Sequence, residues 1–217
     1  PMKQKTLVLT AALMTLLVYS CKKDNDSGAI PDVVYPNYSQ LKVGNYWVYE
    51  QFDIDNAGNA TSKNTFDSCY VEKDTIINGK TYFKLVKPKP YLPNQQDIFF
   101  QRDSLHYTVN ANGKIAFSSL DFSTVFDSGY FMAGPDTVCK IMNQMGDKNM
   151  TLTTPAGTFT TSTAKEIYLM YPNWAVAGNP RYLNTRYAEN IGIVIETLPF
   201  FTSNPNYIER RLIRYQI

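Results

Sequence analysis

The chain has few of the residues from which metal centres and most catalytic sites are built. Its 217 residues include one histidine, His106, and three cysteines. The first cysteine, Cys21, ends the apolar N-terminal segment, and the remaining set of one histidine and two non-adjacent cysteines cannot supply the four ligands of a zinc site. We therefore expect no metal and no cofactor. His106 follows Asp103 and Ser104 in DSLHY, but catalytic triads assemble from distant segments, which favours a surface strand here. We assign no catalytic residue, and a hydrolase that uses carboxylates is the alternative.

The chain also has little net charge. It carries 21 Lys and Arg against 19 Asp and Glu. Two of the lysines, Lys3 and Lys5, lie in the first twenty residues, so residues 21–217 balance at 19 − 19 = 0. A neutral chain has no general electrostatic attraction for nucleic acid or for anionic lipid. We therefore expect no nucleic-acid partner.

Long apolar runs are absent apart from one near the start. Leu7 to Val18 is apolar except for two threonines, and it is shorter than the roughly 20 residues that cross a bilayer. It follows Lys3 and Lys5 and ends at Ser20-Cys21, which is typical of a secretory signal. The sequence predicts a signal peptide over 1–20, a polar, proline-broken tether over 21–40 and one domain over 41–217.

The signal ends at a cysteine in a recognisable setting. Val18-Tyr19-Ser20-Cys21 resembles the lipobox of bacterial lipoproteins, in which the signal is removed and the cysteine is acylated. The resemblance implies palmitate-like chains on Cys21, and several such chains anchor a protein firmly. We expect a protein held on the outer membrane, at its periplasmic face or at the cell surface, whose membrane contact is this anchor.

No stretch of eleven or more residues shows a helical period. Tyrosine (16) and phenylalanine (12) are abundant, and aromatic residues favour strands. Asn78-Gly79 between two strand-like runs predicts a type I′ hairpin, and Pro155-Ala156-Gly157 predicts a second hairpin. The sequence therefore predicts an all-β fold, an antiparallel meander that forms a curved sheet, half-barrel or barrel-like domain.

Three blocks carry a second resemblance: LKVGNYWVYE (41–50), TPAGTF (154–159) and YAENIGIVIE (187–196). They resemble recurring blocks of a group of uncharacterised, lipid-anchored, β-rich envelope proteins of the Bacteroidota type. The resemblance implies a curved antiparallel sheet and no reaction. From the residues themselves we expect a group of glycines at turns or bulges and a group of large apolar residues on one face. The glycines are Gly44, Gly157 and Gly192, and the apolar residues are Trp47, Phe159 and Ile193.

Two cysteines follow Cys21. An exported chain meets oxidising conditions, so Cys69 and Cys139 could form one disulfide. Two separate buried thiols fit the sequence equally well, because sequence does not give the distance between them.

The segment DIDNAGN at 53–59 alternates Asp and Asn, as calcium loops do. It lacks the bidentate glutamate of the twelfth position, where Asn64 stands. A turn is the better interpretation of these residues.

One loop is a candidate contact surface. YPNWAVAGNPRY (171–182) carries Tyr171, Trp174 and Tyr182, and large aromatic residues in loops often meet a ligand or a partner. Alternatively, Trp174 folds back to cap the sheet. The sequence thus predicts a non-catalytic binding or accessory module of the envelope, with an apolar, glycan or protein ligand. A structural component of an envelope complex is a further alternative.

Overall fold

The structure, a computed structural model, describes residues 33–92, 94–198 and 207–217. The chain divides into two compact units, residues 1–34 and Tyr35–Ile217, and the second unit contains all the strands below. It starts six residues before the predicted start at Leu41. The predicted signal peptide and Cys21 lie outside the described residues. Among the described residues, no helix is both long and apolar enough to cross a membrane.

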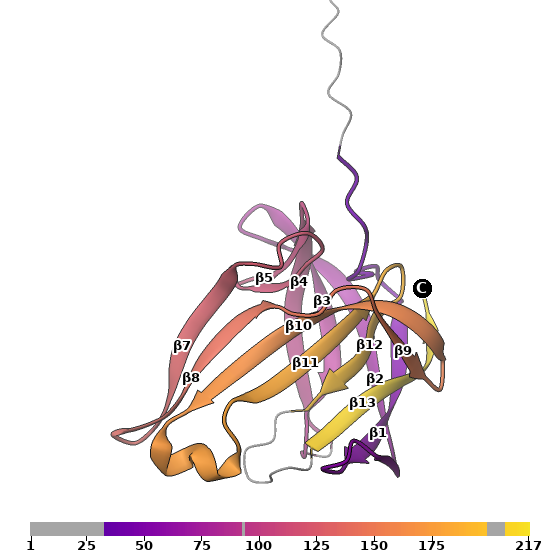
Figure 1. The fold of residues 1–217 in the computed structure, drawn as a ribbon. Helices are drawn as coiled ribbons and strands as arrows, with labels where there is room; N and C mark the ends of the chain where they lie inside the picture. The colour runs from indigo at the N-terminus through magenta and orange to yellow at the C-terminus, as the bar shows by residue number, and fades with distance from the viewer. Residues whose placement is uncertain (1–32, 93, 199–206) are drawn as a thin grey trace, which may run out of the picture. The chain divides into compact units, whose positions relative to one another are not determined.

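The described part of the chain forms a single antiparallel sheet, which confirms the predicted all-β fold (Figure 1). The strand order is β6-β5-β4-β3-β2-β1-β13-β12-β11-β10-β8-β7, and β9 pairs with β10 outside this path. β6 and β7 are the two ends of the order, and the sheet curls until it is nearly closed into a barrel. The strands are β1 Tyr46–Ile54, β2 Ala60–Ile77, β3 Lys80–Pro88, β4 Gln96–Ser104, β5 Tyr107–Asn110, β6 Ile115–Ser118, β7 Val125–Ala133, β8 Asp136–Met145, β9 Met150–Thr154, β10 Gly157–Met170, β11 Arg181–Ala188, β12 Gly192–Thr197 and β13 Tyr207–Gln216.

The predicted hairpins are present. Asn78 and Gly79 both have positive φ, 50° and 72°, between the paired residues Ile77 and Lys80. These are the angles that a type I′ turn requires. In the second hairpin Gly157 pairs with Thr154 and joins β9 to β10.

The main hydrophobic core lies against β1. Trp47 is buried there together with the partly buried Phe159 and Ile193, which confirms that these three pack together. Its indole Nε1 donates a hydrogen bond to the Ile191 carbonyl at 2.6 Å. Gly192 has φ +101°, and a Cβ on it would lie 3.0 Å from the Trp47 ring. The backbone of β12 can therefore approach the indole only because residue 192 is glycine.

Residues 35–40, which we call the N-terminal strap, are bound to one end of the sheet. The Asn37 carbonyl accepts a hydrogen bond from Asn190 N at 2.7 Å, and Ser39 Oγ donates to Asp103 Oδ2 at 2.6 Å. The Tyr38 ring lies 4.9 Å from the ring of Phe117 on β6. The opposite end of the sheet carries the 3₁₀ helix η1, Pro172–Ala177 (Figure 1).

Candidate functional site

The concave side of the sheet encloses an open cavity of about 310 Å³, which we call the lumen cavity. Nine strands contribute to its wall, from both halves of the nearly closed sheet. Its lining residues are Leu85, Lys87, Phe99, Gln101, Asn110, Ile115, Ala116, Phe126, Asn143, Gln144, Ala164, Lys165, Glu166, Leu183, Thr185, Tyr187, Ile193, Glu196 and Thr197. A cavity of this volume is within the range of small-molecule sites in proteins.

The lining mixes amide and hydroxyl groups with aromatic rings. Gln101, Asn110 and Asn143 can each donate and accept hydrogen bonds through their amides. The rings of Phe99 and Phe126 supply apolar surface beside them. The two lysines and two glutamates of the lining cancel to a formal charge of 2 − 2 = 0.

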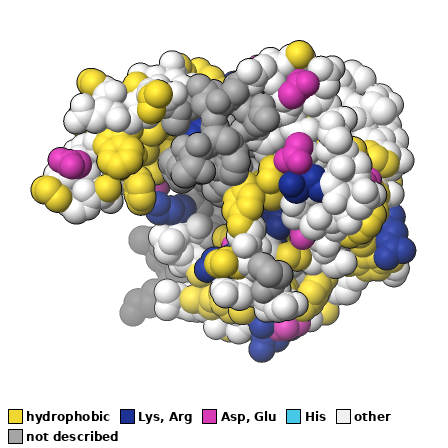
Figure 2. Space-filling view, turned by 90° about the horizontal axis from the view of Figure 1, so that it is seen from below, with side chains coloured by type: hydrophobic (Ala, Val, Ile, Leu, Met, Phe, Trp, Pro, Cys, Tyr) yellow, Lys and Arg dark blue, Asp and Glu magenta, His cyan; other side chains and the backbone are white. Residues whose placement is uncertain are grey.

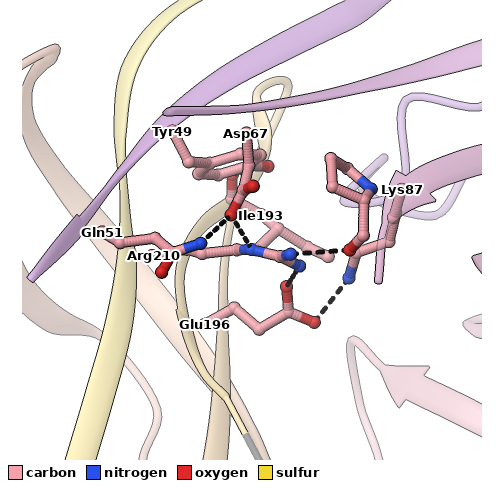
Figure 3. Close-up of polar contacts among 8 residues, drawn as sticks. Tyr49, Gln51, Asp67, Lys87, Ile193, Glu196 and Arg210 are labelled. Carbon is pink, nitrogen blue, oxygen red and sulfur yellow. Dashed lines mark hydrogen bonds and ion pairs between the residues drawn. The ribbon is translucent and has the colours of Figure 1, made fainter. Parts of the chain in front are cut away.

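A network of charged side chains is buried beside the cavity (Figure 3). At its centre is Arg210 of β13, whose side chain is 2% exposed. Its Nε donates to Asp67 Oδ2 at 2.5 Å, its Nη1 contacts Glu196 Oε2 at 3.4 Å and its Nη2 donates to the Pro88 carbonyl at 2.7 Å. All three of these contacts join the guanidinium to an oxygen, as a buried cation requires.

The network continues from Glu196 to the cavity wall. Lys87 Nζ contacts Glu196 Oε1 at 2.5 Å, so each carboxylate oxygen of Glu196 faces one cation. Burial alone would raise the pKa of Glu196, but the charges of Lys87 and Arg210 outweigh burial and lower it. For Arg210 the charges of Glu196 and Asp67 likewise outweigh burial and raise the pKa. The charged forms of Glu196 and Arg210 are therefore both favoured by their neighbours in the network.

Two buried tyrosines stand near this network. Tyr49 donates its hydroxyl to the Ile193 carbonyl at 2.9 Å, and burial raises its pKa well above the ordinary value. Burial also raises the pKa of Tyr187, with the charge of Glu196 as a smaller cause. Both phenols therefore stay neutral and act as fixed hydrogen-bonding and packing groups.

Two carboxylates, Glu166 and Glu196, line the same cavity, so the hydrolase alternative can be examined on geometry. Glycosidases need one free carboxylic acid and one carboxylate across the substrate. Both oxygens of Glu196 are occupied by cations, and Glu166 Oε1 accepts the Tyr168 hydroxyl at 2.6 Å. The contacts of Glu196 leave it without a free oxygen for proton transfer, which favours binding over hydrolysis.

The structure brings two of the three predicted aromatic residues together. Tyr171 and Trp174 line a second cavity of about 320 Å³ beside η1, whereas Tyr182 is not part of its lining. Trp174 is 39% exposed. The Tyr182 ring lies 5.4 Å from Lys165 Nζ instead.

The two remaining cysteines are free and buried in the structure. Cys69 belongs to the core cluster of Trp47, and Cys139 belongs to a separate cluster with Tyr168 and Met170. Burial raises the pKa of Cys69 to about 12, which leaves its thiol protonated and unreactive at neutral pH.

The residues of DSLHY do not assemble into a triad. His106 Nδ1 lies 3.0 Å from Ser118 Oγ, and Asp103 binds the hydroxyls of Ser39 and Thr108. In DIDNAGN, Asp55 accepts hydrogen bonds from the backbone N–H groups of residues 57 and 59, which confirms the turn. The described residues contain no group of three or more His, Cys, Asp or Glu that could hold a metal ion.

Sequence reasoning missed the charged network and the cavity. Asp67, Lys87, Glu196 and Arg210 come from four strands spread over the chain. The available signal was the run Glu209-Arg210-Arg211 between the apolar residues Ile208 and Leu212. Consecutive charges in a strand place at least one of them on the covered face.

The fold has counterparts among solved structures. A protein from Bacteroides fragilis, described as exported and as having a YmcC-like fold, matches with a TM-score of 0.52 and 13% identity, over 84% of this chain and all of that one. A protein from Parabacteroides distasonis, described as a lipoprotein, matches with a TM-score of 0.50 and 14% identity, over 85% of this chain and all of that one. At this identity the likeness concerns the fold. No protein-family profile matches the chain, and no curated protein matches it.

Proposed function

We propose that this protein is a lipid-anchored binding protein of the bacterial cell envelope, which holds a small, neutral, polar ligand in the lumen cavity. The envelope location is supported by the lipobox-like sequence that ends at Cys21 and by the two structural neighbours, described as an exported protein and a lipoprotein. The observation that carries the ligand proposal is the polar, charge-balanced lining of the cavity.

The lining distinguishes between the ligand classes that the sequence left open. An acyl chain in the cavity would displace the water around the amides of Gln101, Asn110 and Asn143. It could not replace the hydrogen bonds that this water makes with them. Each buried polar group left unsatisfied costs about 1–3 kcal/mol. A hydroxyl-rich ligand replaces those bonds, and the rings of Phe99 and Phe126 can cover its apolar parts.

The volume of the lumen cavity and the charge of its lining restrict the class of ligand further. A volume of about 310 Å³ corresponds to roughly ten water molecules at their share of liquid volume. The lysines and glutamates of the lining cancel, and the cations Lys87 and Arg210 already pair with Glu196. An anionic ligand that paired with Lys87 or Arg210 would have to break those pairs. The cavity therefore suits an uncharged molecule of the size of one or two sugar rings.

The ligand proposal can be tested by calorimetry with the full chain. The probes are neutral mono- and disaccharides, with palmitate as the apolar comparison. Thr185→Trp should fill the cavity and abolish saccharide binding, because Thr185 lines the lumen. Ser68→Trp adds the same bulk at an exposed position of β2 and should leave binding unchanged. Binding of palmitate alone, or saccharide binding that survives Thr185→Trp, would contradict the proposal.

The anchor is tested separately. Mass spectrometry of protein purified from its natural membrane should find residues 1–20 removed and acyl chains on Cys21. Cys21→Ala should release the protein from the membrane fraction and leave its thermal unfolding unchanged. An N-terminal peptide that still contains residues 2–20 in the mature protein would refute the anchor and leave the ligand proposal intact.

A further inference from the structure

A second cavity of about 320 Å³ lies at the end of the sheet opposite the N-terminal strap, and we call it the η1 groove. The β7–β8 turn and the start of β8 supply one wall, and Tyr171 with the start of η1 supplies the other. Its lining residues are Pro135, Asp136, Thr137, Tyr171, Pro172, Asn173 and Trp174. None of these residues lines the lumen cavity, so the two sites can be changed independently.

The groove displays aromatic surface to solvent. Tyr171 and Trp174 are 42% and 39% exposed. In Figure 2, hydrophobic side chains gather at the projecting β7–β8 hairpin and η1, at the left of the view. Exposed rings that are not needed for the core are typical of surfaces that meet a ligand.

The loop that carries the rings is held in place by its backbone. Tyr171 N donates to the Val138 carbonyl at 2.9 Å, and Trp174 N donates to the Tyr171 carbonyl at 2.8 Å. The Asn179 side chain clamps Met170, accepting from its N–H at 3.1 Å and donating to its carbonyl at 3.2 Å. Because the loop is ordered before a ligand arrives, binding loses little conformational entropy.

Polar groups of the groove are available to a ligand. Asp136, Thr137 and Asn173 supply a carboxylate, a hydroxyl and an amide. Across the described ranges, no hydrogen bond or ion pair occupies the side chain of Asp136, of Asn173 or the indole N–H of Trp174. The lining contains no lysine or arginine, so it offers nothing to balance an anionic ligand.

Flat rings beside a carboxylate and an amide suit one chemical class. A sugar ring has an apolar C–H face that can lie on an indole, and hydroxyl groups around its rim that can donate to a carboxylate. An acyl chain or an apolar peptide would cover Asp136 and leave its charge unpaired. We propose that the η1 groove is a second binding site that takes a neutral saccharide, with the sugar stacked on Trp174 and a hydroxyl donated to Asp136.

The probes are neutral tetrasaccharides of glucose, mannose, galactose and N-acetylglucosamine, with a galacturonate tetrasaccharide as the acidic comparison. The full chain is kept in a detergent without a sugar head group, and binding is followed by the change in tryptophan fluorescence. The chain has two tryptophans. Trp47 is buried at 4% exposure, so a ligand in the groove changes the emission of Trp174. At least one neutral probe should bind saturably.

Two variants identify the site. Asp136→Ala alters an exposed side chain and should weaken binding about tenfold, the loss expected for one charge-assisted hydrogen bond. Trp174→Ala should weaken it at least as much, measured by saturation-transfer NMR since the optical signal is lost. Tyr130→Ala is the matched control, because Tyr130 is 61% exposed on β7 and does not line the groove. Thr185→Trp, which fills the lumen, should leave this binding unchanged.

Three results would overturn the proposal. The first is the absence of saturable binding by all four neutral probes. The second is tighter binding of the acidic probe than of any neutral one. The third is binding that Asp136→Ala and Trp174→Ala both leave intact. The side chain of Asp136 makes no hydrogen bond or ion pair within the described residues, so its variant tests the site even if Trp174→Ala disturbs η1.

Discussion

Arg210→Met is the substitution for which the structure makes the sharpest prediction. It removes a guanidinium that is 2% exposed and bonded to Asp67, Glu196 and the Pro88 carbonyl. Hydrogen bonds to charged groups contribute about 1.5–3 kcal/mol each, and removing one partner of a buried ion pair costs about 3–5 kcal/mol. We expect Arg210→Met to lower the free energy of unfolding by about 3–5 kcal/mol. The sum over three hydrogen bonds would be larger, but the substitution also removes the cost of burying the cation.

The assay is urea unfolding at pH 7, followed by the fluorescence of Trp47, which is buried in the core. With a urea dependence of about 2 kcal/mol per molar, a loss of about 3–5 kcal/mol lowers the midpoint by about 1.5–2.5 M. Arg214→Met makes the same change at an exposed position of the same strand, and it should alter stability by less than about 0.5 kcal/mol.

A double-mutant cycle with Asp67→Asn separates the ion pair from general effects of the substitutions. The combined variant should lose less stability than the sum of the two single variants, because each single variant already breaks the same contact. A loss in Arg210→Met as small as in Arg214→Met, or strict additivity in the cycle, would refute the reasoning.

Three further outcomes are expected. Gly192→Ala should lower the free energy of unfolding by about 1–3 kcal/mol, because φ +101° is unfavourable for alanine and its Cβ would lie 3.0 Å from Trp47. Thermal unfolding measures this loss, and an unchanged midpoint would contradict the prediction. Glu196 has a lowered pKa in the folded state, so its contribution is present above about pH 4.5 and is lost as pH falls through the folded pKa. Glu196→Gln should therefore be less stable than the natural protein at pH 7, and the difference should shrink in acid; a difference constant between pH 7 and 3 would contradict this. Cys69, with a pKa of about 12, should resist alkylation in the native protein and react in urea, as peptide mass spectrometry can show; labelling of the native protein would exclude its burial.

Local patterns were enough to predict much of the fold. Asn78-Gly79 and Gly157 mark hairpins because few residues accept positive φ, and both turns are present. The packing of Trp47 with Phe159 and Ile193 also followed from the blocks in which they stand. These features depend on residues that are neighbours in sequence, or on large apolar residues that are expected in the hydrophobic core.

The candidate sites depend on contacts that no local pattern contains. Arg210 meets Asp67 across 143 positions of the chain, and a charged residue in a strand is ordinarily assigned to the solvent face. The η1 groove shows the same limit. Trp174 was identified from its loop, but its neighbours Pro135 and Asp136 come from the β7–β8 hairpin. This hairpin was not among those predicted, although Gly134-Pro135 is a turn signal and Gly134 has positive φ.

The position of the N-terminal strap has a consequence for how a tethered molecule could present its two sites. Cys21 and Tyr35 are 14 positions apart, so the connecting chain spans at most about 50 Å even when fully extended. Since the strap is bound at the β11–β12 turn and β11 then runs its eight residues to η1, the η1 groove lies about 27 Å farther along the barrel. If Cys21 carries acyl chains, the tether would join the folded unit at its strap end, and the η1 groove would open at the other end of the barrel.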